Sequence, residues 1–188
     1  DVDLVAATGA GDELRLFFQK DTEPGAFEQA ATGPLNVTSP ISVAAADLDG
    51  DGDVDLVSAN FFSNDLMLFF QKNTEPGTFE QGASTLPTGT EPRHVVAADL
   101  DGDGDVDLVS ANQASNSLTL FFQKDMEPGA FEPAATGPLT SAGGPWFVAV
   151  ADLDGDGDMD LVTANQNGDN LTLFFQTSPG DFTQQTTT

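Results

Sequence analysis

The stretch ADLDGDGDVDLVSAN at residues 46–60 decides the fold, because the chain contains it three times. It recurs unchanged at residues 98–112, and again at residues 151–165 with Met159 and Thr163 as its two changes. The acidic part of each copy opens on an aspartate, and these are Asp47, Asp99 and Asp152, spaced 52 and 53 residues apart. Self-similarity at one fixed period is the sequence signature of a repeat architecture.

A second block keeps the same period. FFQK starts at residues 17, 69 and 121, FFQT starts at residue 174, and each is followed by a Pro-Gly-x-Phe turn. At this period the 188 residues hold about 3.6 units. Within a unit, short apolar runs alternate with turn residues and show no helical periodicity. In the second unit the pattern predicts four strands, at residues 42–47, 55–60, 66–71 and 78–82.

The predicted strands indicate an all-β fold of stacked sheets. The runs LVSA and LMLFF are apolar on both faces, which suits sheets that are covered on both sides. Four-stranded units of this length that stack radially are the blades of a β-propeller, with a β-solenoid or a string of small sandwiches as the alternatives. The predicted division is residues 1–46 for an incomplete first blade plus the start of the next inner strand, followed by residues 47–98, 99–151 and 152–188.

Composition excludes several classes of partner. The chain has 31 Asp and Glu against 5 Lys and Arg, a formal charge of −26, which repels phosphate backbones and anionic lipid surfaces. With 39% hydrophobic residues and 15 Phe it is nevertheless a folding chain. The absence of Cys rules out disulfides, thiolate metal sites and a Cys nucleophile. We expect a mature, soluble chain with no nucleic-acid partner and no membrane insertion.

The acidic loop DLDGDGDVD carries the strongest functional signal. Carboxylates at its positions 1, 3 and 5 converge when the chain curls, and glycines at positions 4 and 6 permit the curl. Position 7 offers a carbonyl, and the aspartate at position 9 closes the shell. Oxygen ligands in this number suit Ca²⁺ better than Mg²⁺. The loop differs from an EF-hand, which needs a Glu at position 12 and flanking helices. An acidic turn that holds no ion is the alternative.

These residues resemble the FG-GAP/VCBS-type repeats of calcium-binding β-propellers, such as the blades of integrin α-subunit heads and of certain propeller lectins. The resemblance extends over essentially the whole chain, with the same repeat period throughout. It implies three Ca²⁺ sites, each with four aspartate side chains and the carbonyl of the aspartate at position 7. The implied ligands are Asp47, Asp49, Asp51, Asp53 and Asp55; Asp99, Asp101, Asp103, Asp105 and Asp107; and Asp152, Asp154, Asp156, Asp158 and Asp160.

The chain opens inside such a loop, since Asp1 and Asp3 align with its positions 7 and 9. Either the chain is an excerpt of a longer array, or a neighbouring copy supplies the missing half and a fourth site. Propellers of this family commonly close with about seven blades, roughly twice this length. We therefore expect self-association, head to tail or ring-completing, or a chain that continues.

The loops of the units differ between the two ends of the predicted blade. The acidic loops and the Pro-Gly turns barely change between units, whereas the two connections at the other end vary. Variable loops on a fixed scaffold are where binding is usually found, although drift on a free surface explains them too. The candidate ligand-binding residues are Phe61, Phe62, Arg93, His94, Trp146 and Phe147. For Trp146, stacking on a sugar ring and plain packing are the two alternatives.

The sequence offers little for catalysis. His94 is the only histidine, and no G-x-S-x-G elbow is present. The prediction is a secreted or cell-surface, calcium-binding scaffold with a structural or adhesive role and no enzyme activity. A propeller lectin is the alternative, and a polysaccharide lyase is a further one because related calcium propellers include such enzymes. Asn36 and Asn170 lie in N-glycosylation sequons, which also occur by chance.

Overall fold

The computed structural model describes residues 3–20 and 22–187, and all regular structure in them is β-strand. The strands form four antiparallel sheets. The first sheet contains β1 (Leu4–Thr8), β2 (Glu13–Gln19), β3 (Phe27–Gln29) and β4 (Leu35–Asn36), and the second contains β5 (Pro40–Ala46), β6 (Asp55–Asn60), β7 (Asp65–Lys72), β8 (Glu75–Gln81) and β9 (Leu86–Pro87). The third contains β10 (Pro92–Ala98), β11 (Asp107–Asn112), β12 (Ser117–Gln123), β13 (Phe131–Pro133) and β14 (Leu139–Thr140), and the fourth contains β15 (Pro145–Ala151), β16 (Asp160–Asn165), β17 (Asn170–Ser178) and β18 (Asp181–Thr187).

The main path of each sheet is a meander in which neighbouring strands are consecutive in sequence, as expected for a propeller blade. The second predicted strand matches β6 residue for residue. The first begins two residues earlier, because Pro40 pairs with Asn60 across a bulge in the ladder. The two-residue strands β4, β9 and β14 pair with β2, β7 and β12, respectively. They were not predicted, since two residues give no periodic signal.

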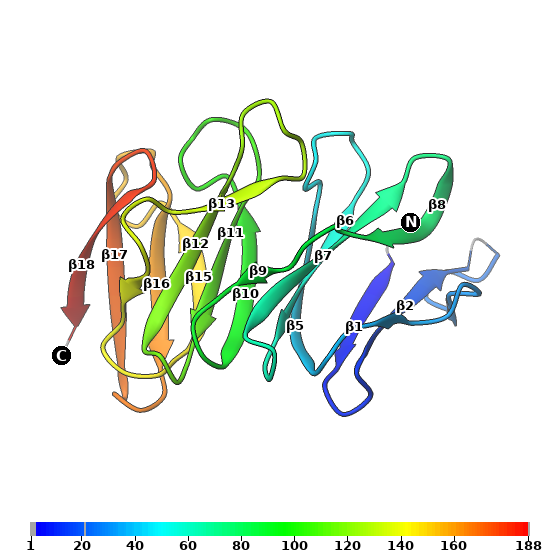
Figure 1. The fold of residues 1–188 in the computed structure, drawn as a ribbon, viewed down its shortest axis with the longest axis horizontal. Helices are drawn as coiled ribbons and strands as arrows, with labels where there is room; N and C mark the ends of the chain where they lie inside the picture. Colours follow the sequence, from blue (N-terminus) through cyan, green and yellow to red (C-terminus); the bar gives the residue numbers. More distant parts are fainter. Residues whose placement is uncertain (1–2, 21, 188) are drawn as a thin grey trace.

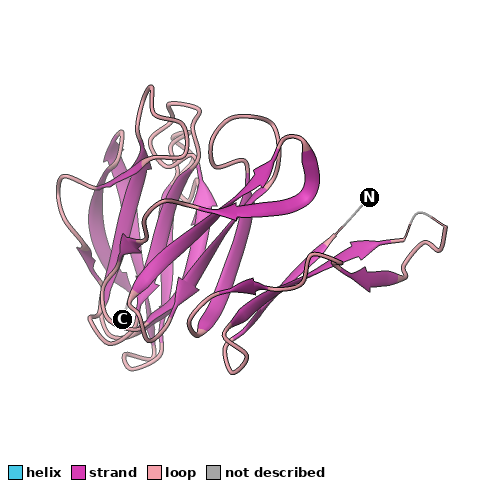
Figure 2. Cartoon of the chain, turned by 45° about the vertical axis from the view of Figure 1, so that its right-hand side comes forward, coloured by secondary structure: helices cyan, strands magenta, loops and turns pink. Residues whose placement is uncertain are grey.

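The four sheets follow one another along an open array, with the first and fourth sheets at opposite ends (Figure 1). The loops from β5 to β6 and from β10 to β11 lie at the upper end in this view, and the loops from β6 to β7 and from β11 to β12 lie at the lower end. Figure 2 shows the same stack of strands from a second direction. Among the described residues, no helix is long and apolar enough to cross a membrane.

The hydrophobic core lies between the sheets, with one cluster at each junction. Between the second and third sheets, Leu66 and Leu68 of β7 pack with Leu108 of β11 and Phe121 of β12. Their exposed fractions are 3% or less. Equivalent clusters join the first sheet to the second and the third sheet to the fourth. Because each blade is buried on both sides only when it has two neighbours, stability depends on the stacking.

Candidate metal centre

The three acidic loops connect the first and second strands of the second, third and fourth sheets. In the first of these loops, Gly50 and Gly52 have φ angles of 74° and 93°, a conformation that costs other residues energy. The carboxylate of Asp47 accepts hydrogen bonds from both glycine N–H groups, at 2.7 and 3.0 Å. The loop therefore curls around its first aspartate, and the other two loops repeat these contacts from Asp99 and Asp152.

In each loop the curl brings together the aspartates at positions 1, 3 and 9. One carboxylate oxygen of each lies within 4.8 Å of those of the other two. The three clusters are Asp47, Asp49 and Asp55; Asp99, Asp101 and Asp107; and Asp152, Asp154 and Asp160. The same three loop positions meet in all three units, as the repeat predicts.

The aspartate at position 9 is buried and tied to the sheet. Asp107 is 1% exposed, and its Oδ2 and Oδ1 accept hydrogen bonds from the backbone N–H groups of Leu100 at 2.8 Å and Gln123 at 2.9 Å. Asp55 and Asp160 make the equivalent pairs of contacts. Burial outweighs the hydrogen bonds and raises the pKa of Asp55 to about 6 and the pKa of Asp107 to about 7.

The aspartates at positions 5 and 7 stand outside these clusters. Asp51 is exposed, and its Oδ1 accepts a hydrogen bond from the N–H of Asp53 at 2.9 Å. Asp103 and Asp156 make the same contact with Asp105 and Asp158, at 2.8 and 3.0 Å. Of the ligands implied by the resemblance, the structure thus brings together three carboxylates per loop and uses the fourth to stabilise the turn.

The donor set fits a divalent cation that prefers oxygen. Three carboxylates per loop are hard ligands, and within the described residues none of the ion pairs of Arg15, Arg93 or Lys124 reaches a loop aspartate. The pKa of Asp49 is raised, first by burial and then by the charge of Asp51. A bound cation would neutralise this repulsion, so the loops are candidate metal centres.

The incomplete first loop is represented by Asp3, because Asp1 lies outside the described residues. The Oδ1 of Asp3 accepts a hydrogen bond from the N–H of Gln19 at 2.9 Å. This is the contact that Asp107 makes with Gln123 in the third sheet. Asp3 therefore occupies position 9 of the repeat in the first sheet as well.

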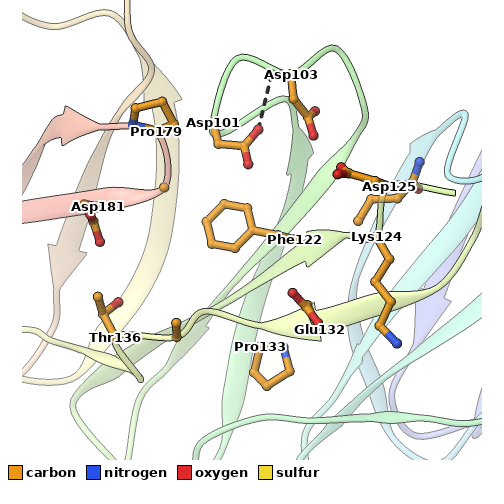
Figure 3. Close-up of a pocket in the computed structure, with 13 residues that line it drawn as sticks. Asp101, Asp103, Phe122, Lys124, Asp125, Glu132, Pro133, Thr136, Pro179 and Asp181 are labelled. Atoms are coloured by element: carbon orange, nitrogen blue, oxygen red, sulfur yellow. Dashed lines mark hydrogen bonds between the residues drawn. The ribbon is translucent and has the colours of Figure 1, made fainter. Parts of the chain in front are cut away.

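A cleft of about 490 Å³ opens beside the second loop, between the third and fourth sheets (Figure 3). The ring of Phe122 and the loop residues Asp101 and Asp103 line it. Three further carboxylates, from Asp125, Glu132 and Asp181, line the same cleft. This concentration of negative charge attracts cations to the end of the molecule that carries the loops.

At the opposite end, Arg93 lies between two aromatic rings. Its guanidinium carbon is 4.3 Å from the ring centre of Phe61 and 4.3 Å from that of Trp146. Its Nε donates to the side-chain oxygen of Gln113 at 2.7 Å, and Gln113 donates in turn to Gln166 at 2.7 Å. These residues link the second, third and fourth sheets, so Phe61 and Arg93 serve packing between blades.

The other candidates at this end are partly exposed. Phe62 is 73% exposed, Trp146 42% and Phe147 51%. The ring of His94 stacks on Phe147 with 3.7 Å between the ring centres, and burial lowers the His94 pKa. The structure brings the six candidates together in two groups. Arg93 contacts Phe61 and Trp146, and Phe62 contacts Phe61; His94 and Phe147 form the second group. The sequence analysis missed Gln113 and Gln166. Both residues directly follow the repeated stretch in their units, and this shared position could have identified them.

A hollow of about 310 Å³ lies beside Trp146 on the fourth sheet, and Asp169, Asn170 and Leu171 are among the residues that line it. Asn170, the second sequon asparagine, accepts a hydrogen bond from the Asn165 amide at 2.9 Å. The first sequon residue, Asn36, is exposed on β4.

Comparison with known families agrees with this geometry. Residues 1–58, 47–110 and 99–163 match the FG-GAP-like repeat, and residues 144–183 match the FG-GAP repeat. The fold and the loops define a β-propeller-type repeat protein. The chain belongs to the FG-GAP repeat family, because the matches extend over most of its length. No curated protein matches the sequence significantly.

Solved structures share the fold at low identity. A Bacteroides uniformis protein provisionally described as a 6-phosphogluconolactonase has a TM-score of 0.66 and 17% identity, over 97% of this chain and 53% of its own. A functionally unknown protein from Desulfotomaculum acetoxidans has a TM-score of 0.61 and 13% identity, over 95% and 53%. The chain therefore spans about half the length of these two proteins.

Proposed function

We propose that this protein is an extracellular, calcium-binding scaffold with a structural or adhesive role and no catalytic activity. The observation that carries the proposal is the meeting of the same three aspartates in three loops. Carboxylate oxygens are the donors that Ca²⁺ prefers, and a flexible loop that uses its backbone for the turn accommodates the larger ion. Each ion would join the strand before the loop to the strand after it, and so stabilise the blade.

Thermal unfolding tests the calcium assignment. We expect the melting temperature to fall when EGTA is added, to recover with Ca²⁺ and to recover much less with Mg²⁺. Trp146, the single tryptophan, provides the fluorescence signal. An unchanged melting curve in EGTA would contradict the assignment.

Two conservative variants connect the effect to one loop. Asp101→Asn removes a charge from the second cluster and is expected to weaken the response to Ca²⁺. Glu28→Gln removes a charge from an exposed residue of β3, outside the clusters and the cleft, and is expected to leave the response unchanged. Equal responses of the two variants would show that general charge, and not the loop, is responsible.

Carbohydrate binding is the second candidate function, favoured by the hollow beside Trp146. An exposed indole next to Asp169 and Asn170 offers a ring face with hydrogen-bonding groups at its edge, which suits a sugar. A glycan array with the unaltered chain and Trp146→Ala tests this function. Binding that the substitution abolishes would support a lectin, and an array without signal would count against it.

A further inference from the structure

The cleft between the third and fourth sheets (Figure 3) is larger than its equivalent one junction earlier. Its volume is about 490 Å³, against about 260 Å³ for the hollow beside Phe70, the counterpart of Phe122. Four residues separate Gln123 from the proline of the next turn in the third sheet, whereas two separate Gln176 from Pro179 in the fourth. The shorter turn fills less of the space beside Phe122. Both walls of the cleft therefore belong to an internal junction of the array.

Three carboxylates outside the acidic loops line this cleft. Asp125 lies in the turn after β12, Glu132 lies in β13 and Asp181 begins β18, and all three are exposed. The position of Asp181 holds alanine or threonine in the other three units. The ion pairs found among the described residues involve none of these carboxylates, and the neighbouring Lys124 pairs with Glu127 at 3.4 Å. Their charge is therefore available to a ligand.

Gln123 is an independent sign that the cleft has a ligand. It lines the cleft and is 8% exposed, and among the described residues its Oε1 has no hydrogen-bond partner. The equivalent oxygens of Gln71 and Gln176 accept the N–H of the turn glycine, at 2.8 and 2.9 Å. A buried acceptor without a donor is unfavourable, and a ligand N–H would satisfy it. The last torsion of a glutamine side chain is broad, so the amide can turn its oxygen toward a donor in the cleft.

These groups suit an extended organic cation better than a bare metal ion. Within the part of the chain that the structure describes, three carboxylates meet within 4.8 Å only in the acidic loops. Those of Glu132 and Asp181 lie on different sides of the Phe122 ring instead (Figure 3). The ring, Pro133 and Pro179 offer apolar contact to methylene groups, and an aromatic face also attracts an ammonium group. Separate charges around an apolar floor match a carbon chain with an ammonium group at each end.

We propose that this cleft binds a linear aliphatic polyamine. One ammonium group donates to the Gln123 oxygen and pairs with a nearby carboxylate, the carbon chain crosses the Phe122 ring, and the other ammonium group pairs with a carboxylate on the far side. The binding groups lie outside the three carboxylate clusters. The inference goes beyond the proposed scaffold function, because it adds a small-molecule ligand that the calcium sites do not require.

Isothermal titration with hexamethylenediamine measures the binding, in Ca²⁺ so that the loops are loaded. We expect one saturable site per chain, with an affinity that falls as sodium chloride is added, because ion pairs contribute to it. Hexylamine has the same carbon chain and a single ammonium group, and it should bind about fivefold more weakly. A titration without saturable binding, or equal affinity for the two amines, would overturn the proposal.

Single substitutions locate the site. Asp181→Asn and Glu132→Gln each remove one cleft carboxylate and should weaken diamine binding by about twofold to fivefold. Glu80→Gln is the matched control, because Glu80 is the exposed counterpart of Glu132 one junction earlier and does not line the cleft. It should bind the diamine as the unaltered chain does. The same loss in all three variants would show general attraction to a chain of charge −26 and would refute the site.

Hexamethonium tests the role of Gln123, because it has the same carbon chain and charge as the diamine but no N–H group. The unaltered chain should bind it about tenfold more weakly than hexamethylenediamine. Gln123→Leu should bind the two compounds alike. The substitution removes an acceptor that has no partner, so the fold should persist, and the melting temperature in Ca²⁺ checks this. A preference for the diamine that survives Gln123→Leu would contradict the assigned contact.

Repeating the titration in EGTA separates this site from the calcium loops. The diamine should still bind to one site that Asp181→Asn weakens. Binding that appears only in EGTA, and that Asp47→Asn reduces, would place the diamine in the loops and overturn the proposal. Calcium binding without a diamine site refutes this inference alone. A diamine site sensitive to Asp181→Asn in a chain that binds no calcium refutes the calcium assignment alone.

Discussion

At the scale of single residues, the aspartate at position 9 has two tasks that can be separated. It belongs to the carboxylate cluster, and its two oxygens accept hydrogen bonds from the start of the acidic loop and from the strand that follows its own. The sequence predicts the first task from the spacing of the aspartates. It does not reveal the second, because both donors are backbone groups that come together only in the folded sheet.

Replacing Asp107 should therefore destabilise the protein even without calcium. Asp107→Ala leaves the buried N–H groups of Leu100 and Gln123 without acceptors, at a cost of about 1–3 kcal/mol each. Urea unfolding in EGTA measures the loss of free energy. Asp125→Ala, at an exposed position, should change it little. Similar losses for both variants would contradict the assigned contacts.

The raised pKa values predict how the calcium-free protein responds to pH. Asp55 and Asp107 titrate near 6 and 7 in the folded chain, against 3.8 in the unfolded chain, so the folded state holds more protons in between. Their contribution is present below pH 3.8 and is lost as the pH rises through 6 and 7. His94 acts in the opposite sense, since its lowered pKa reduces stability below pH 6.5.

Urea unfolding in EGTA at pH 5 and pH 8 measures the sum of these effects. We expect the protein to be less stable at pH 8, because two carboxylates outweigh one imidazole, and we expect Ca²⁺ to remove most of the difference. Greater stability at pH 8 in EGTA would mean that the two aspartates are charged in the folded protein without an ion.

At the scale of strands and loops, the sequence predicts the elements that repeat in every unit but not the contacts made by loops whose sequence varies. Alternation and turn residues predicted the strand at residues 55–60 to the residue, and the acidic loop between two strands. They did not predict β9 or its counterparts, or the role of Asn116 in a loop whose sequence varies. Asn116 has φ 53°, and its side chain reaches the segment before the fourth sheet.

Asn116→Ala should weaken the junction between the third and fourth sheets. The substitution removes the hydrogen bond to Gly144 and places alanine in a left-handed conformation, each worth about 1–2 kcal/mol. Two control variants separate these effects. Asn116→Gly removes the hydrogen bond without the conformational cost. Asp169→Ala, at φ 48° in the corresponding loop of the fourth sheet, adds the conformational cost without loss of this hydrogen bond. Hydrogen exchange of β15 and β16 reports on the junction. Equal protection in Asn116→Ala and the unaltered chain would show that the contact contributes nothing.

At the scale of the whole molecule, period and composition predicted stacked all-β blades and an acidic protein, because both depend on sums over many residues. The pairing of Phe61, Arg93 and Trp146 could not be predicted, since it depends on how three separate sheets are offset. Three bound Ca²⁺ ions would change the net charge from −26 to −20, so the loaded protein should remain acidic.

The stoichiometry of calcium binding tests the central claim most directly. Isothermal titration of the chelator-treated chain with Ca²⁺ should give three sites per chain, one for each carboxylate cluster, and two sites for Asp101→Asn. Binding heat should accompany a rise in melting temperature over the same range of Ca²⁺. A titration without saturable binding, or an unchanged number of sites in the variant, would contradict the assignment of the three loops.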